Sequence, residues 1–243
     1  MHHATLDQWA RGSSALHRRD ARVKWLVLVA YLAALSATRS LFPMCVLGFA
    51  ALAAGAIRLG RLPFAGVLAR AGVVAPFAGV ITLFTWLGGE GGRALAVLVR
   101  SYLSAVAVLV LVGTTPLPTL LSGLTSLGVP RFLVLVVQFL YRYLFVLSEQ
   151  AQHMRLAAAS RGWQAGRWRP DPAGFRAAAG VAAALFLSSQ AKAQAVHRAM
   201  LARGFQGRLV TLAPPALSIA DLWFLAAGVG ACAGLWLAAN LFG

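Results

Sequence analysis

The sequence predicts an all-α, polytopic membrane protein with about five transmembrane helices and two further long helices. Of the 243 residues, 60% are hydrophobic and only 12% are charged, and the mean hydropathy is +0.75. A water-soluble domain of this size needs far more polar surface. The apolar runs are about 15–22 residues long without strict alternation, which favours helices over a lipid-facing barrel. The sequence has 22 Lys+Arg against 6 Asp+Glu. The basic residues lie mostly between apolar runs, as expected for cytoplasmic loops of a membrane protein. The excess of positive charge is therefore explained without nucleic-acid binding.

Five apolar segments are predicted to cross the bilayer. A cluster of basic residues before the first segment places the N-terminus in the cytoplasm, and the parity of the spans then places the C-terminus outside. Pro76 is expected to kink the third segment near its start. The predicted spans are residues 23–37, 41–57, 72–87, 93–112 and 221–241.

The pattern changes between the fourth and fifth segments. A short amphipathic helix is predicted over residues 119–127, followed by long helices over 131–164 and about 175–201. Each long helix is apolar first and alanine-rich later, so hydropathy leaves open whether it crosses the bilayer fully. The excess of basic over acidic residues from Arg131 to Arg208 favours the cytoplasmic side. The predicted division is therefore 1–113, 114–213 and 214–243.

Each long helix ends in the same four-residue pattern. Arg161-Gly162-Trp163-Gln164 and Arg203-Gly204-Phe205-Gln206 lie 42 positions apart. Glycine tolerates the positive φ found just past a helix C-terminus, and an arginine in the last turn is favoured by the helix dipole. A guanidinium beside an aromatic ring suits an acidic groove with an apolar pocket.

Simple helix termination explains a single copy equally well, whereas two extended copies favour docking to a partner with two equivalent surfaces. The candidate docking residues are Ala159, Ser160, Arg161, Gly162, Trp163, Ala202, Arg203, Gly204 and Phe205.

Two arginines are candidate intramembrane charges. Arg100 lies inside the fourth span, where it either faces the bundle interior with a partner or snorkels to the interface. Arg142, in the apolar half of the first long helix, is expected to pair with Glu149. The predicted spans hold no cluster of His, Cys, Asp or Glu with metal-ligand spacing, and the sequence has no phosphate-binding Gly-x-x-x-x-Gly-Lys-Ser/Thr loop.

With these doubled Arg-Gly elements, the chain resembles the transmembrane (T) component of energy-coupling factor (ECF) transporters. The stretch from Ser14 to Lys24 is similar to the family's opening Ser-x-Leu-His-x-x-Asp-Pro-Arg-x-Lys, which points to the cobalt branch, CbiQ. The resemblance covers essentially the whole chain. Ser160 stands where the family's first Ala-Arg-Gly has alanine, and Ala21 stands where proline is usual.

The resemblance implies a non-enzymatic coupling subunit in the cell inner membrane. Its expected partners are two ABC ATPases (CbiO-like) and a membrane subunit that captures the substrate (CbiM-like, with CbiN-like), in a bilayer. ATP and cobalt are expected on those partners and no cofactor on this chain, and the cobalt would supply cobalamin biosynthesis. The alternatives are a T component for nickel or a vitamin, a membrane-embedded enzyme such as a lipid-modifying transferase, and a self-sufficient channel or secondary transporter.

Overall fold

The computed structural model describes residues 9, 12–38, 43–89, 91–161, 172–206 and 218–241. These residues form helices joined by turns, and no strand occurs among them. The fold is therefore all-α, as the sequence predicts. Contacts divide the chain into two units, one of residues 1–129 with 215–243 and the other of residues 130–214.

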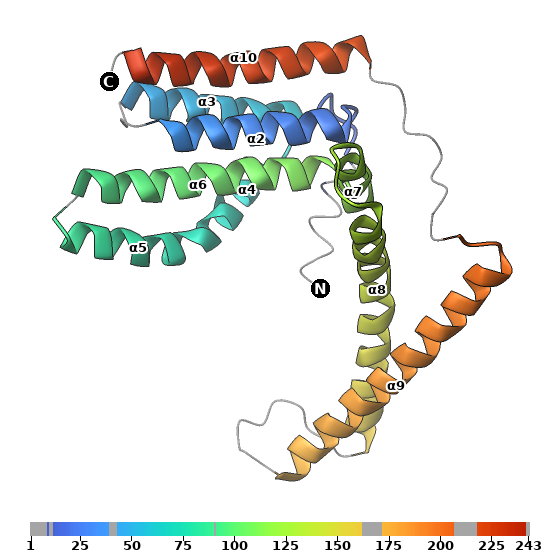
Figure 1. Cartoon of the computed structure of the whole chain (residues 1–243). Helices are drawn as coiled ribbons and strands as arrows, with labels where there is room; N and C mark the ends of the chain where they lie inside the picture. Colours follow the sequence, from blue (N-terminus) through green and yellow to red (C-terminus); the bar gives the residue numbers. More distant parts are fainter. Residues whose placement is uncertain are drawn as a thin grey trace. The chain divides into compact units, whose positions relative to one another are not determined.

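The first unit is a bundle of apolar helices (Figure 1). Helix α10 packs on α2 and α3, and α6 packs on α2, α3, α4 and α5. Phe49, Ile57 and Val67 are almost fully buried between these helices. The elements are α2 (Ala21–Ala37), α3 (Pro43–Gly60), α4 (Phe64–Ala71), η1 (Gly72–Val74), α5 (Ala75–Leu87), α6 (Gly91–Thr114), α7 (Leu117–Ser126) and α10 (Ile219–Leu241).

The third predicted span has a more complex start than expected. Residues 64–71, which lie outside the predicted spans, form α4. Burial of Val67 and Ala71, which are both fully buried, stabilises this short helix. A single 3₁₀ turn then separates α4 from α5. Pro76 lies in the first turn of α5, where its missing N–H costs no helix hydrogen bond. The 3₁₀ turn thus lies directly before α5 and Pro76, while a kink caused by Pro76 itself stays a prediction.

Four of the described helical segments are long and apolar enough to cross a bilayer. They are 64–87, 91–114, 131–160 and 219–240. Helices α2 and α3 have 17 and 18 residues and therefore reach about 26 Å each, slightly less than a typical hydrocarbon core. The chain is thus a multi-pass membrane protein, and the first long helix is apolar enough to be one of its spans.

Two cations fix α2 against α6. Lys24, near the start of α2, donates a hydrogen bond to the carbonyl of Thr114 at the end of α6, with Nζ and O 3.1 Å apart. Arg100, within α6, donates to the carbonyl of Thr38, the residue that caps the end of α2. Each cation thus satisfies a carbonyl that the helix end leaves without an intrahelical partner.

The second unit consists of α8 (Arg131–Ser160) and α9 (Pro172–Ala202). Both agree with the predicted long helices within three or four residues, and residues 162–171 lie outside the described part. The 30 residues of α8 form one uninterrupted helix about 45 Å long. The short helix α7, grouped with these helices in the sequence-based division, belongs by its contacts to the first unit, where it packs on α2.

Candidate functional site

The long helices α8 and α9 cross, and a polar contact joins them (Figure 1). The side-chain amide of Gln150 donates a hydrogen bond to Ser188 Oγ at 2.5 Å. The Lys192 ammonium donates to the oxygen of the same amide. All three side chains are half-buried. Gln150 therefore uses both ends of its amide to hold α9, and one face of each helix is fixed towards the other.

The crossing lies at the same distance from both Arg-Gly elements. Gln150 precedes Arg161 by eleven residues, and Lys192 precedes Arg203 by eleven residues. Each helix therefore extends about 16 Å from the contact to its arginine. The C-terminal ends of α8 and α9 point away from each other (Figure 1). The repeat in the sequence corresponds to two arms of equal length.

The second Arg-Gly element ends α9 in a Schellman motif. Gly204 has φ +77°, and its N–H donates to Leu201 O at 3.0 Å, while the N–H of Phe205 donates to Met200 O at 3.0 Å. This pattern requires the left-handed conformation that glycine adopts without strain. The prediction that a glycine past the helix end takes positive φ is confirmed here. Arg203 is thereby fixed as the last residue before the chain turns.

The first element ends α8 in a similar position. Arg161 caps the helix with φ −90° and ψ 14°, and its N–H donates to Ala158 O at 3.1 Å. The hydroxyl of Ser160 donates to Ala157 O at 2.9 Å. The serine that replaces the family's alanine is thus satisfied within its own helix. Gly162 and Trp163, also candidate docking residues, lie outside the described residues.

The two arginines are exposed and available for a partner. Neither guanidinium has a hydrogen bond or ion pair with another described residue. Ala159, Ser160 and Ala202 beside them are exposed as well, while Phe205 is half-buried. The described residues directly before each arginine, Ala159 and Ser160 in α8 and Ala202 in α9, are small.

The alanines do not mediate the helix crossing. The sequence suggests that Ala157–Ala159 and Ala195, Ala199 and Ala202 allow the two helices to approach each other. All of these except Ala158 are exposed, because the polar contact lies earlier in each helix, at Gln150 in α8 and at Ser188 and Lys192 in α9. The sequence does hold a signal for this contact. Gln150, Ser188 and Lys192 are the polar residues at the point where each helix changes from apolar to alanine-rich, and this position could have predicted the crossing.

The candidate intramembrane arginines have different surroundings. Arg100 is partly buried and faces the bundle, with its guanidinium on Thr38 O and its Nε without a hydrogen bond among the described residues. Arg142 is exposed, and the pairing with Glu149 is not found. Glu149 instead lies 4.0 Å from His153, because a residue four positions away is only about 6 Å along the helix, whereas Arg142, seven positions away, is about 10 Å along it.

The second unit is strongly basic. Its described residues, 130–161 and 172–206, carry eight Lys and Arg side chains and a single acid, Glu149. Such a charge distribution attracts acidic surfaces and repels other basic ones. A partner of the two arms is therefore expected to present carboxylates.

These features define the class as an integral membrane protein of apolar helices that carries a basic pair of crossing helices. Residues 12–212 match the family model of CbiQ, described as cobalt transport protein. The cobalt transport protein CbiQ of Rhodobacter capsulatus is 30% identical over 204 residues, which cover 80% of this chain and 82% of the relative. The chain belongs to the CbiQ family of cobalt transport proteins.

Proposed function

We propose that this chain is the coupling subunit of an ECF-type cobalt importer. The Arg161 and Arg203 ends dock into two ATPase subunits, and the helices carry the motion of those subunits to a separate membrane subunit that captures the substrate. The observation that carries this proposal is the equal length of the two arms, eleven residues each from the Gln150–Lys192 contact.

Equal arms suit a partner made of two equivalent subunits. Two identical ATPases offer two identical grooves, and a single chain can fill both only if it presents the same element twice. The crossing contact joins the arms, so a displacement of one end is resisted by the other helix. A pair of ATPases that closes around ATP can thereby move both helices together.

The chemistry of the ends fits a carboxylate groove. A guanidinium can bind a carboxylate through two parallel hydrogen bonds, and burial against an aromatic ring strengthens such a pair. Arg203 and Phe205 adjoin Gly204 at the end of α9. Because positive charge in membrane proteins accumulates on the cytoplasmic side, we place both ends in the cytoplasm, where ATP is available.

On this proposal the chain itself catalyses no reaction and binds neither ATP nor cobalt. Cobalt selectivity resides in the capture subunit, so nickel or a vitamin would be transported by the same coupling mechanism with another capture subunit. A membrane-embedded enzyme is the alternative from another class. It would show activity when this chain is purified alone.

Charge reversal at the arms tests the proposal. The single variants Arg161→Glu and Arg203→Glu, and the double variant, are expressed in the native host with an affinity tag. Co-purifying ATPase and cobalt uptake by whole cells are measured. Each single variant is expected to lose about tenfold in ATPase binding, and the double variant about a hundredfold or more, because each change removes a buried ion pair.

The matched control is Arg176→Glu. Arg176 is exposed and lies on α9, about 40 Å along the helix from Arg203. It makes the same charge change without altering an arm end, and it is expected to leave ATPase binding and uptake intact. Undiminished co-purification and uptake in the double variant would show that the arms are not the docking elements.

A further inference from the structure

We propose that residues 19–25, here called the N-terminal clamp, are positioning residues that transmit the motion of the coupling helices into the helix bundle. This inference rests on the proposed function. The N-terminal clamp holds both places where the chain passes between its two units, namely the α6–α7 connection with α7 before residue 130 and the start of α10 after residue 214.

Lys24 holds the α6–α7 connection. Its side chain is only 4% exposed, and its ammonium donates to Thr114 O at 3.1 Å and to Thr115 Oγ1 at 2.6 Å. Both threonines are buried as well. A buried ammonium with two such partners is costly to displace, because its charge would lose both hydrogen bonds without gaining water. Lys24 thus fixes the point at which the chain leaves α6.

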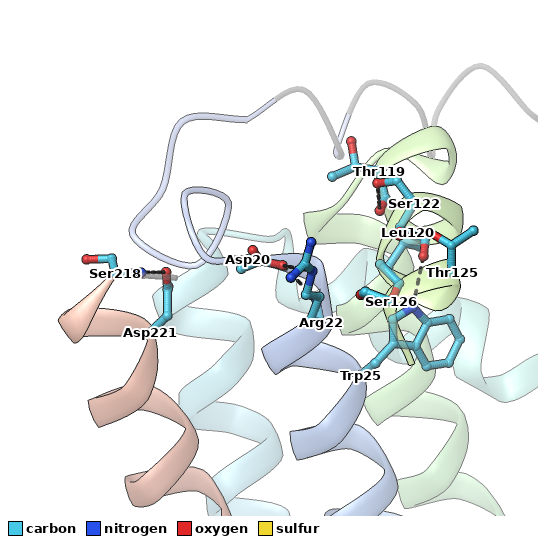
Figure 2. Close-up of polar contacts among 11 residues, drawn as sticks. Asp20, Arg22, Trp25, Thr119, Leu120, Ser122, Thr125, Ser126, Ser218 and Asp221 are labelled. Atoms are coloured by element: carbon cyan, nitrogen blue, oxygen red, sulfur yellow. Dashed lines mark hydrogen bonds and ion pairs between the residues drawn. The ribbon is translucent and has the colours of Figure 1, made fainter. Parts of the chain in front are cut away.

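A second contact holds α7 itself on the start of α2. The indole N–H of Trp25 donates to Leu120 O at 3.2 Å, and Trp25 is seen pointing towards α7 in Figure 2. Gly123 of α7 lies so close to α2 that a Cβ built there would be 3.1 Å from Ala21 Cβ. Little room remains for α7 to slide over α2.

The same segment holds the start of α10. Arg19 Nη1 lies 3.5 Å from Asp221 Oδ1, and Asp221 is 6% exposed. The other carboxylate oxygen of Asp221 accepts the N–H of Ser218 at 3.2 Å, which caps α10 (Figure 2). Asp20 in turn caps α2 by accepting the N–H of Arg22 at 2.9 Å. The N-terminal clamp therefore joins the starts of α2 and α10.

The consequence is mechanical. In the chain α7 leads into α8, and α10 follows α9, so both chain connections between the coupling helices and the bundle begin at elements that the N-terminal clamp holds. With the N-terminal clamp intact, α2 moves with α7 and α10. When the contacts of the N-terminal clamp are removed, α8 and α9 can move with the ATPases without moving the helix bundle.

The test compares transport with ATP hydrolysis in the intact complex. The complex is purified through a tag on this chain and reconstituted into liposomes with radioactive cobalt as the probe. In the Lys24→Met variant, cobalt transported per ATP hydrolysed is expected to fall roughly tenfold, a typical loss of coupling between sites. Arg18→Met is the matched control, because Arg18 is exposed and lies directly before the N-terminal clamp. Trp25→Phe, which removes the indole N–H and part of the ring but keeps an aromatic side chain, serves as a second and milder variant should Lys24→Met fail to assemble.

A disulfide supplies the complementary measurement. Cysteines at Ala21 and Gly123 would have Cβ atoms 3.1 Å apart, so a separation of α7 from α2 by about 0.5 Å brings them to disulfide geometry. In a Lys24→Met background, oxidation of the Ala21→Cys and Gly123→Cys pair is expected to restore most of the coupling, and reduction to remove it again. Gly123→Cys alone is the control, since the native Cys45 and Cys232 are both buried.

The outcomes separate this inference from the proposed function. The Lys24→Met complex is expected to retain its ATPase subunits, because Arg161 and Arg203 are unchanged. If the unaltered chain purifies without ATPases, the proposed function fails. If the unaltered complex transports cobalt and Lys24→Met keeps the same cobalt-to-ATP ratio, or if the disulfide restores nothing, the clamp has no part in coupling.

Discussion

The Arg100 guanidinium donates a hydrogen bond to the main-chain carbonyl of Thr38, and Lys24 makes the reciprocal contact to Thr114. Thr38, the C-cap of α2, follows Lys24 by fourteen positions, and Thr114 follows Arg100 by fourteen positions in α6. The two helices run antiparallel in Figure 1. Each cation therefore neutralises the negative end of the other helix, and the two contacts fix one register between α2 and α6.

Removing the Arg100 contact should loosen this register. In Arg100→Met the Thr38 carbonyl loses its charged donor, and the free energy of unfolding is expected to fall by about 2 kcal/mol. Arg142→Met is the control, because Arg142 is exposed without a described partner. Denaturant titration in detergent, followed by helical circular dichroism, measures both. Equal stability of the two variants would contradict a structural role for Arg100.

The contact between α10 and α2 depends on a glycine. A Cβ built at Gly228 would lie 2.9 Å and 3.0 Å from the two γ-methyl carbons of Val27. Because valine is stiff at χ1, α10 must move away, and Gly228→Ala is expected to cost about 1–2 kcal/mol.

Gly230, two residues along the same helix, provides the matched comparison. A Cβ there meets no atom within 4 Å. Gly230→Ala is therefore expected to be neutral or to stabilise α10 by about 0.5 kcal/mol through its helix propensity. The same denaturant titration measures the pair, and destabilisation of similar size in both variants would argue against the proposed close approach.

Gly204 should be required for docking although it has no side chain. Alanine at its φ of +77° is strained by about 1 kcal/mol. Gly204→Ala is therefore expected to disturb the placement of Arg203 and Phe205, and to weaken ATPase co-purification several-fold with both side chains still present. Gly180→Ala in the first third of α9, where a Cβ meets nothing within 4 Å, is expected to bind the ATPases normally.

The Gln150 contact should fix the geometry of the arms. Spin labels on cysteines at Ser160 and Ala202, both exposed, report the distance between the arm ends by pulsed electron paramagnetic resonance. Gln150→Ala removes the hydrogen bonds to Ser188 and Lys192 and is expected to broaden the distance distribution. Gln152→Ala, an exposed neighbour, should leave it unchanged. A distribution unaffected by Gln150→Ala would mean that other contacts hold the crossing.

Much of the fold could be predicted from the sequence because local signals determine it. Hydropathy gave the helices of the bundle within a few residues, and Pro76 and Gly204 lie where their backbone chemistry requires an interruption and a helix end. Helix α4 was missed because Arg70 belongs to a basic cluster that was assigned to the cytoplasmic side, so the predicted span began only at residue 72. Its burial depends on packing by residues distant in the sequence, including the Trp9 ring that lies 4.1 Å from the Arg70 guanidinium carbon.

The sequence by itself determined the membrane class, the order of the helices and the two identical Arg-Gly ends, since composition, periodicity and glycine conformation act over a few neighbouring residues. Only the tertiary structure decided which partners the charged side chains take. Arg100 meets Thr38, Lys24 meets Thr114, and Gln150 meets Lys192, across separations of 42 to 90 residues that no local pattern encodes. The equal length of the two arms could be recognised only from the sequence and the tertiary structure together. The sequence contains the Arg-Gly repeat, and the tertiary structure shows the helix crossing from which each arm is measured.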